Sequence, residues 1–305
     1  MVHGTHNAVY DERNNSIRVY VNGQFFQRND AKISVFDSGY LVGDGIWEAI
    51  RLVKGTLVFF DDHMERLWTA SKATGIKFQF SKEELKSIIY KVLNENNMKD
   101  GVHVRIMITR GIKKTPSQDP RLTISEPNLV IIPEYKLADQ SSKKIGIKLF
   151  TSAIRRGSPD YLDPKLNCHS KLHEVQALIQ AIEAGADEAL MLDVNGFVST
   201  CNSTNFFMIK KGVVYTSTGQ YCMNGITRQK VIDVCKILNI PCKEQNFSLF
   251  DVYGADEAFV TGTFAGITPV NSIDGRQIGN KSNNEISATL DNAYKDLVNQ
   301  QIKNG

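Results

Sequence analysis

Residues 262–270 read Gly-Thr-Phe-Ala-Gly-Ile-Thr-Pro-Val and follow an apolar stretch at 257–261 that has the pattern of a buried strand. A glycine and a threonine at a strand end indicate a turn where backbone N–H groups and a hydroxyl can hold an anion. Residues 225–228, Gly-Ile-Thr-Arg, are similar, because a helix opens there after a glycine and presents N–H groups at its positive end. Each pattern alone is also typical of an ordinary turn or helix start.

Strand and helix patterns alternate around these two turns in the second half of the chain. Strands are expected at 144–152, 187–192, 206–209 and 212–216. A helix from Ser170 to Gly185 should bury one apolar face made of Leu172, Val175, Leu178, Ile179 and Ile182.

The first half has the signals of a smaller α/β domain. Hairpin turns are expected at Asn22-Gly23 and Lys54-Gly55, and helices after Asp61 and after the N-cap candidate Ser81. Two further strands are expected at 102–109 and 128–133. These patterns predict an N-terminal α/β domain at 1–133, a polar linker at 134–144 and a larger C-terminal domain at 145–305.

Composition excludes several classes of function. The 305 residues carry a formal net charge of only +3, without a basic face, so we expect no nucleic-acid partner. No apolar run approaches the ~20 residues that span a bilayer, and no signal pattern stands at the N-terminus, so we expect no membrane partner. Five cysteines without C-x-x-C spacing favour reduced thiols and a cytoplasmic location.

Other motifs give the chain a family resemblance. They are Phe36-Asp-Ser-Gly-Tyr40, Gly43-Asp-Gly-Ile-Trp-Glu48, His63-Met-Glu-Arg-Leu67 and Gly185-Ala-Asp-Glu-Ala-Leu190. With the two turns, in this order, the chain resembles class IV pyridoxal-phosphate aminotransferases of the branched-chain and D-amino acid type from about Val21 to Leu297. The resemblance implies a two-domain α/β (α+β) fold of type IV, like D-amino acid aminotransferase, with a cofactor cleft between the domains. It also implies a homodimer that moves an amino group between an amino acid, branched-chain ones included, and a 2-oxo acid.

The same resemblance assigns residues to the cofactor, pyridoxal 5′-phosphate, and to the substrate. Its phosphate would be held by Arg66, Ile226, Thr227 and Thr263, which agrees with the preference of a phosphate for a guanidinium and helix-start amides. The substrate side would include the residues Trp47, Arg105, Phe264 and Ala265. Trp47 is equally typical of a core, and Arg105 or Arg110 is also a candidate partner for Glu48.

Two positions depart from the family pattern. Asn167 stands where the family has the lysine that forms an imine with the cofactor, and an amide can neither form an imine nor move a proton. Thr200 stands where the family sets a glutamate against the pyridine nitrogen, and a hydroxyl can at most share one hydrogen bond there.

Two lysines are candidates for the missing amine. If the backbone is helical, Lys171 and Asn167 share a face ~5–6 Å apart, so Lys171 is the preferred imine-forming residue. Lys165 would share a strand face with Asn167. A rival hypothesis takes Cys168, His169 and His173 as metal ligands, but no fourth ligand is evident, so we expect no metal.

Three hypotheses about function remain open. The first is a pyridoxal-phosphate aminotransferase in which Lys171 anchors the cofactor. The second is a divergent enzyme on the same scaffold that binds the cofactor non-covalently, or works without it, and has altered or no transaminase activity. The third is a non-catalytic protein that keeps only the phosphate pocket.

Overall fold

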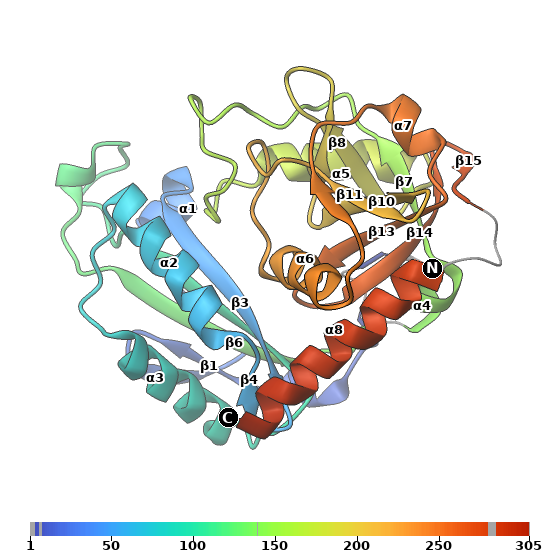
Figure 1. Ribbon diagram of the computed structural model, residues 1–305. Helices are drawn as coiled ribbons and strands as arrows, with labels where there is room; N and C mark the ends of the chain where they lie inside the picture. The colour runs from blue at the N-terminus through green and yellow to red at the C-terminus, as the bar shows by residue number, and fades with distance from the viewer. Residues whose placement is uncertain (1–3, 6–7, 139, 280–284, 305) are drawn as a thin grey trace. The chain divides into compact units, whose positions relative to one another are not determined.

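The computed structural model describes residues 4–5, 8–138, 140–279 and 285–304. The chain forms two compact units (Figure 1). Unit 2 contains Val9–Leu137, Asn167–Ser170 and the last residues from Gln301, while unit 1 contains the rest of the chain. The expected α/β fold with two sheets is confirmed.

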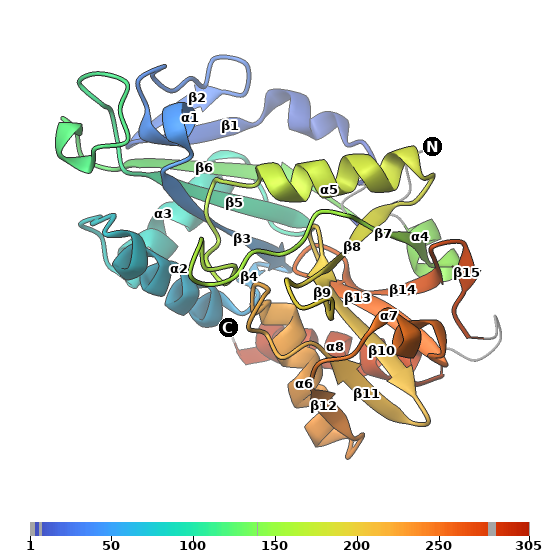
Figure 2. The ribbon, with the colours of Figure 1, turned by 90° about the horizontal axis from the view of Figure 1, so that it is seen from above.

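Unit 2 is built on an antiparallel sheet. Among the described residues this sheet has six strands, in the order β2-β1-β6-β5-β3-β4 (Figure 2). Its strands are β1 (Arg18–Val21), β2 (Gln24–Gln27), β3 (Gly45–Val53), β4 (Thr56–Leu57), β5 (Val102–Thr109) and β6 (Asn128–Tyr135). Its helices are η1 (Glu12–Ser16), α1 (Ser38–Val42), α2 (Phe60–Thr74), α3 (Lys82–Glu95) and η2 (Pro120–Leu122).

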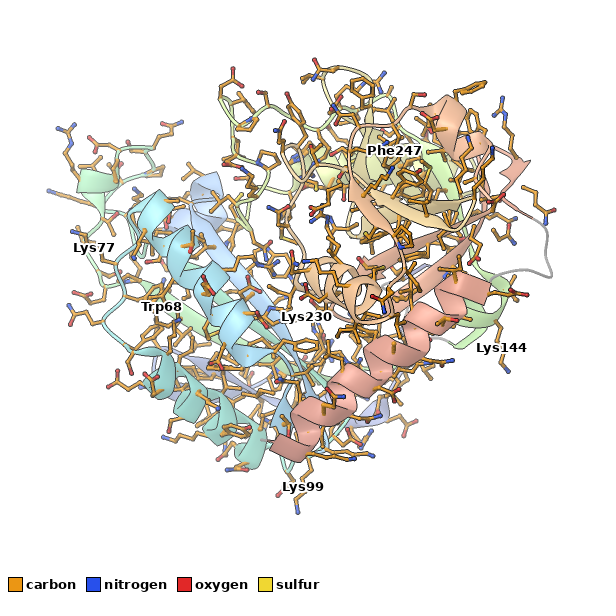
Figure 3. All side chains as sticks on the ribbon, in the orientation of Figure 1. Trp68, Lys77, Lys99, Lys144, Lys230 and Phe247 are labelled. Atoms are coloured by element: carbon orange, nitrogen blue, oxygen red, sulfur yellow. The ribbon has the colours of Figure 1, made fainter. Side chains whose placement is uncertain are left out.

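Local sequence signals account for much of unit 2. Asn22 and Gly23 both adopt positive φ (46° and 92°), as the expected hairpin turn requires. Ser81 and Glu84 form a capping box at the start of α3, as expected. Helices α2 and α3 pack on the sheet through β3, β1 and β6, whereas Trp68 of α2 packs in an aromatic cluster with Phe78 (Figure 3).

Unit 1 contains a second sheet, with the order β12-β11-β10-β13-β14-β7-β8-β9 and β15 beside β14. Its described strands are β7 (Ile147–Thr151), β8 (Glu188–Leu192), β9 (Val198–Cys201), β10 (Asn205–Lys210), β11 (Val213–Thr216), β12 (Cys242–Glu244), β13 (Glu257–Gly262), β14 (Gly266–Ile273) and β15 (Arg276–Gln277). Its helices are α4 (Gln140–Ile145), α5 (Leu172–Glu183), α6 (Ile226–Ile237), α7 (Leu249–Tyr253) and most of α8 (Glu285–Asn304).

The core of unit 1 lies against its central strands. Buried side chains from β10, β13 and β14, such as Phe206, Val260 and Val270, pack with Phe247, which follows β12 (Figure 3). The turns that the sequence marked at 225–228 and 262–270 open helix α6 and join β13 to β14.

Helix α5 corrects the expectation about its buried face. The buried residues are Glu174, Ala177 and Ala181, and the two alanines pack against Ala189 and Met191 of β8. Four of the expected core residues are instead exposed, with exposed fractions of 70% for Leu172, 51% for Val175, 48% for Ile179 and 57% for Ile182. The apolar periodicity is real, but small side chains let the opposite face approach the sheet closely.

The stretch at 134–144 contains the end of β6 at Tyr135 and helix α4 from Gln140. The expected linker and domain limits remain predictions. One short segment of the second half of the chain, residues 167–170, belongs to unit 2. In the described part of the chain, no helix combines the length and apolarity needed to cross a bilayer.

Candidate functional site

Helix α6 begins at Ile226, directly after Gly225. Gln229 N donates to Gly225 O (3.0 Å) and so makes the first helical hydrogen bond. The amides before it, in the first turn, have no acceptor within the helix. The guanidinium of Arg228 is used elsewhere and donates to Ser217 O and Glu244 Oε2, both at 2.7 Å. The buried Thr227 adds a hydroxyl to this helix start, which is therefore suited to an anion.

The loop before α6 is fixed by Asn205 of β10. Its Nδ2 donates to Met223 O (2.9 Å), and a Cβ at Gly225 would lie only 2.2 Å from its Oδ1. Residue 225 must therefore be glycine for the helix start to remain against β10. The carbonyl of Tyr221, in the same loop, accepts from Ser199 Oγ (2.9 Å) and from Arg156 Nε (3.4 Å).

The second turn, Thr263 to Ala265, joins β13 to β14 while Gly262 and Gly266 pair across it. Phe264 and Ala265 are buried, and Thr263 is half-buried. The turn therefore brings the amides of residues 263–265 and the Thr263 hydroxyl to one end of the sheet of unit 1, which is a second set of donors for an anion.

Thr200 is buried in β9 and its hydroxyl has two partners. Its Oγ1 donates to Thr204 O (2.7 Å) and accepts from Asn205 Nδ2 (3.3 Å). Because a hydroxyl has a single proton, Thr200 has none left for another acceptor and can only receive a further hydrogen bond.

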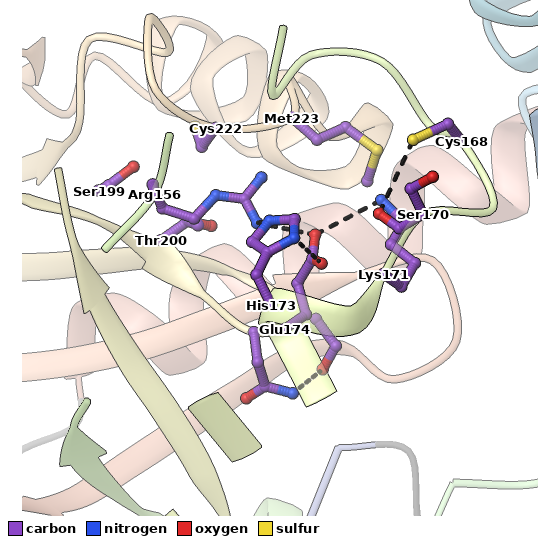
Figure 4. A network of polar contacts seen from close by, with 12 residues as sticks. Arg156, Cys168, Ser170, Lys171, His173, Glu174, Ser199, Thr200, Cys222 and Met223 are labelled. Atoms are coloured by element: carbon purple, nitrogen blue, oxygen red, sulfur yellow. Dashed lines mark hydrogen bonds and ion pairs between the residues drawn. The ribbon is translucent and has the colours of Figure 1, made fainter. Parts of the chain in front are cut away.

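Lys171 is the N-cap residue of α5 and lies in unit 1. Its Nζ is 3.6 Å from Glu174 Oε1, and the same oxygen accepts from Arg156 Nη1 (2.8 Å) (Figure 4). His173 lies between the two partners, with Nδ1 2.9 Å from Glu174 Oε2 and Nε2 3.2 Å from Arg156 Nη1. Three basic side chains therefore surround one buried carboxylate.

A similar cluster stands in unit 2 around Glu48. Arg66 of α2 donates to this carboxylate with Nε (2.6 Å) and Nη2 (2.9 Å), and His63 Nδ1 is 2.8 Å away. Burial by itself would raise the pKa of Glu48, but Arg66 and His63 outweigh it and lower the pKa to about 2. Neither of the two arginines proposed as partners for Glu48 is paired with it, since Arg110 pairs with Asp44 instead.

Asn167 is a structural residue of unit 2, with an exposed fraction of 2%. Its backbone oxygen accepts from Trp47 N (3.0 Å), and its Nδ2 donates to Trp47 O (2.8 Å). Its Oδ1 is buried without a hydrogen-bond partner among the described residues. The segment continues along β3, where His169 N donates to Gly45 O (2.9 Å) and a Cβ at Gly45 would lie 2.7 Å from the His169 ring.

This pairing changes the expectation about the two lysines. Residues 167–170 are extended rather than helical, so Asn167 and Lys171 do not share a helix face. Lys165 is exposed and lies in a turn rather than on a strand. The metal hypothesis also gains no support, because His169 and His173 fall in different units and no metal-binding group of three or more was found among the described residues.

Unit 2 contains a cavity of about 640 Å³ with Arg105 of β5 on its wall. The Arg105 guanidinium lies over the ring of Trp47, with 4.2 Å between its central carbon and the ring centroid. Burial lowers the pKa of Arg105, opposed by the charge of Glu134. Among the described residues, no hydrogen bond or ion pair is found for this guanidinium. The cavity therefore offers a partly desolvated cation to an anionic ligand.

Comparison with known proteins decides the family. The family model for class IV amino-transferases matches residues 45–273. The chain is 37% identical over 285 residues to a branched-chain-amino-acid aminotransferase-like protein of Arabidopsis thaliana (93% of this chain, 51% of that one). It is 32% identical to a D-alanine aminotransferase of Listeria innocua (92% and 96%).

The chain belongs to the class IV aminotransferase family.

A solved structure of the same family agrees in fold. It is the branched-chain amino acid aminotransferase of Escherichia coli, with a TM-score of 0.85, 26% identity, and coverage of 93% of this chain and 95% of that one. Among further solved relatives is a branched-chain amino acid aminotransferase with pyridoxamine 5′-phosphate, at a TM-score of 0.86 and 26% identity. The chain spans about half the length of the first curated relatives that it matches (51% and 54%).

The donors of this class IV family member fit one end of the cofactor better than the other. The glycine-dependent start of α6 and the turn at Thr263 offer amides and hydroxyls of the kind that a phosphate needs. Thr200, which the family pattern predicts to lie beside the ring nitrogen, supplies no carboxylate, and its only proton is already donated. The sequence could locate these positions, but Glu174 and Arg156 carried no signal, because their contacts depend on tertiary structure.

We predict that Glu48 makes this protein sensitive to acid. Unfolded, its carboxyl titrates near 4.5, whereas in the fold its pKa is about 2, so its contribution is present above about pH 5 and is lost as the pH falls toward 2. The full difference corresponds to about 3 kcal/mol. The free energy of unfolding, from urea titrations at pH 6, 5, 4 and 3, should fall less steeply in Glu48→Gln than in the unchanged protein.

The exposed Glu126→Gln is the matched control and should leave that slope unchanged. A slope in Glu48→Gln equal to that of the control would contradict the assignment. The slope should not vanish, since Glu174 titrates over the same range.

Proposed function

We propose that this chain binds pyridoxal 5′-phosphate and transfers an amino group between an amino acid and a 2-oxo acid, with Lys171 as the covalent anchor of the cofactor. The observation that carries the proposal is that Lys171 and the helix start of α6 are joined within one unit. Lys171 contacts Glu174, Glu174 contacts Arg156, and Arg156 contacts the loop that leads into α6.

The phosphate would be bound in unit 1 by Ile226, Thr227 and Thr263, for which the helix start and the β13–β14 turn are the support. Arg66 is proposed as a further phosphate ligand, and its two hydrogen bonds to Glu48 fix the direction of its guanidinium. The amides at Phe264 and Ala265 would receive a substrate carboxylate. The relative solved with pyridoxamine 5′-phosphate supports this cofactor.

When bound, the cofactor supplies an aldehyde carbon and an electron-withdrawing ring. Three of the chain's own residues would act on it. Lys171 would hold the aldehyde carbon and move a proton to or from the substrate. Thr200 would accept a hydrogen bond from the protonated ring nitrogen, and Asn167 would offer its unpaired Oδ1 to a donor. With no carboxylate at position 200, we expect slower proton removal than a glutamate there would give.

A second candidate function is non-covalent binding of the cofactor with altered or no transaminase activity. The observation that favours it is the amide at Asn167 together with the engagement of Lys171 by Glu174. Both candidates use the same phosphate donors, so the covalent link decides between them.

We predict that borohydride traps pyridoxal 5′-phosphate on Lys171. Absorbance near 410–430 nm should disappear on reduction, and peptide mass spectrometry should find the adduct on Lys171 at close to one per chain. Lys171→Ala should lose at least nine-tenths of the adduct, while Lys165→Ala, a change at the exposed neighbouring lysine, should keep it. Binding without any adduct would support the second candidate, and no binding would reject both.

Arg105 is proposed to recognise a second carboxylate on the substrate. A guanidinium at a cavity wall, stacked on Trp47 and without a described ion-pair partner, has the chemistry to bind a carboxylate strongly. Substrates with a short apolar side chain would use the aliphatic lining of the same cavity, which includes Val21, Met107 and Ile132.

We predict that Arg105→Gln weakens binding of a dicarboxylic 2-oxo acid by about 10- to 100-fold, the loss expected for one charged hydrogen-bond pair. Binding of a monocarboxylic 2-oxo acid should change less than threefold. Calorimetry and kcat/KM should agree. Lys32→Gln, which removes another cation from the wall of the cavity, is the control, and equal losses for both acids would contradict the assignment.

A homodimer is proposed from the exposed face of α5. Leu172, Val175, Ile179 and Ile182 form an apolar stripe along the helix, and such a stripe indicates contact with another surface. We propose that a second copy of the chain covers it.

Five free cysteines, four of them buried, support the expected cytoplasmic location.

We predict that Val175→Glu combined with Ile179→Glu lowers the mass measured by light scattering from twice the chain mass of 34.1 kDa to a single chain. Two charges in an apolar interface cost several kcal/mol, enough for dissociation at micromolar concentration. Asn94→Glu, at an exposed position of α3, should remain dimeric. An unchanged mass for the double variant would place any interface elsewhere.

A further inference from the structure

Glu174 is a buried carboxylate in the first turn of α5 whose role the proposed chemistry leaves open. It accepts from Arg156 and lies within ion-pair distance of Lys171 and His173. Burial alone would raise the pKa of Glu174, but His173, Lys171 and Arg156 outweigh that effect and lower the pKa to about 2. The carboxylate is therefore charged at neutral pH.

The contacts of His173 and Arg156 fix this carboxylate. Arg156 is itself buried and donates from Nη1 to both Glu174 Oε1 and His173 Nε2. Because a guanidinium can only donate, His173 Nε2 accepts from Arg156. The other ring nitrogen, Nδ1, lies 2.9 Å from Glu174 Oε2, which has no hydrogen-bond partner among the described residues. The carboxylate is held by two side chains before Lys171 is considered.

Lys171 has the fewest contacts in the cluster among the described residues. Its side chain keeps an exposed fraction of 31%, close to the 36% of His173, whereas Glu174 (9%) and Arg156 (5%) are buried. Among the described residues, its amine contacts Glu174 Oε1 alone, at 3.6 Å. A long side chain with a single tether takes its direction from that tether, because its rotamers are otherwise close in free energy.

Arg156 connects the tether to the helix start of α6. Its Nε donates to Tyr221 O, which also accepts from Ser199. Met223 lies two residues after Tyr221 and just before Gly225, and its carbonyl accepts from Asn205 Nδ2. Figure 4 shows the Arg156 side chain running from Ser199 and Thr200 toward His173 and Glu174, with Met223 on the side of Lys171. All of these residues belong to unit 1.

We infer that Glu174 is a positioning residue for the Lys171 amine, and that Arg156 keeps this amine at a fixed place relative to the loop before α6. The inference rests on the proposed role of Lys171, but the placement of the amine can be tested without cofactor. A purely structural Glu174 would stabilise α5 and leave the reactivity of Lys171 unchanged.

The test measures the reactivity of each lysine in the full-length chain. Isotope-labelled formaldehyde with cyanoborohydride at pH 7.5, followed by peptide mass spectrometry, gives a rate for every lysine separately. We expect Lys171 to react at least three times faster in Glu174→Gln, because loss of the ion pair with Glu174 Oε1 leaves the amine free to meet the reagent. Lys165 should react at an unchanged rate and is the internal control.

A second variant guards against misfolding. Glu174→Asp keeps a carboxylate but withdraws it by one methylene, so Lys171 should react at a rate between those of the unchanged protein and Glu174→Gln. His173→Asn keeps an N–H that can face Glu174 and should stay near the unchanged rate, whereas His173→Ala should shift toward Glu174→Gln. Circular dichroism confirms folding of each variant. Rates at Lys171 within 1.5-fold of one another in all folded variants would overturn the inference.

Addition of pyridoxal 5′-phosphate separates this inference from the proposed function. If both hold, borohydride trapping at Lys171 should fall at least fivefold in Glu174→Gln even though the amine reacts faster with formaldehyde. Faster formaldehyde labelling with no trapping in any variant would keep the positioning role and reject Lys171 as the anchor. Trapping at Lys171 that is equally efficient in Glu174→Gln would reject the positioning role alone.

Discussion

The buried ion pair between Arg156 and Glu174 is the interaction on which the chemistry of unit 1 depends. A guanidinium and a carboxylate taken out of water stabilise a fold only when their remaining donors and acceptors are satisfied. Here Arg156 also contacts His173 Nε2 and the carbonyl of Tyr221, and Lys171 lies beside Glu174 Oε1. Glu174 Oε2 has the ion-pair contact with His173 and no hydrogen-bond partner among the described residues. The contacts of the buried pair therefore join three parts of unit 1: the start of α5, its N-cap residue Lys171 and the loop before α6.

Unit 2 uses the same device with different elements. Glu48 of β3 is buried between Arg66 and His63 of α2, so the two motifs that contain these residues are the two halves of one charged cluster. Arg66 can keep a fixed direction because its Nε and Nη2 are both bound by one carboxylate. A motif read as a phosphate ligand from sequence thus has a second part, the carboxylate that aims it.

Local signals predicted the elements well wherever backbone conformation decided them. The hairpin at Asn22-Gly23, the capping box at Ser81 and the helix start at Gly225 all follow from residues within four positions of one another. The face that α5 buries could not be predicted in this way, because apolar periodicity marks a stripe but does not say which surface covers it. Ala177 and Ala181 form the buried side because the strand beneath them is close.

The relation between Asn167 and Lys171 was beyond local reasoning for another reason. Helical spacing predicts that Asn167 and Lys171 share a face. In the structure, residues 167–170 instead pair with β3, some 120 positions earlier in the sequence, through Trp47 and Gly45. A pairing of that kind is decided by tertiary structure, and it turns the segment into an extended edge of unit 2. The next residue, Lys171, already starts α5 in unit 1.

That pairing also explains why an amide can occupy position 167. The side chain of Asn167 donates from Nδ2 to Trp47 O, and its backbone oxygen accepts from Trp47 N. Asn167 itself is buried. A lysine at this position would either bury an ammonium beside Trp47 or extend past it and leave that carbonyl without its donor, and each costs free energy. The amide at 167 therefore serves the pairing with β3, and the reactive amine that we propose stands at a position where its charge is already matched. Lys171, beside a carboxylate held by Arg156 and His173, is such a position.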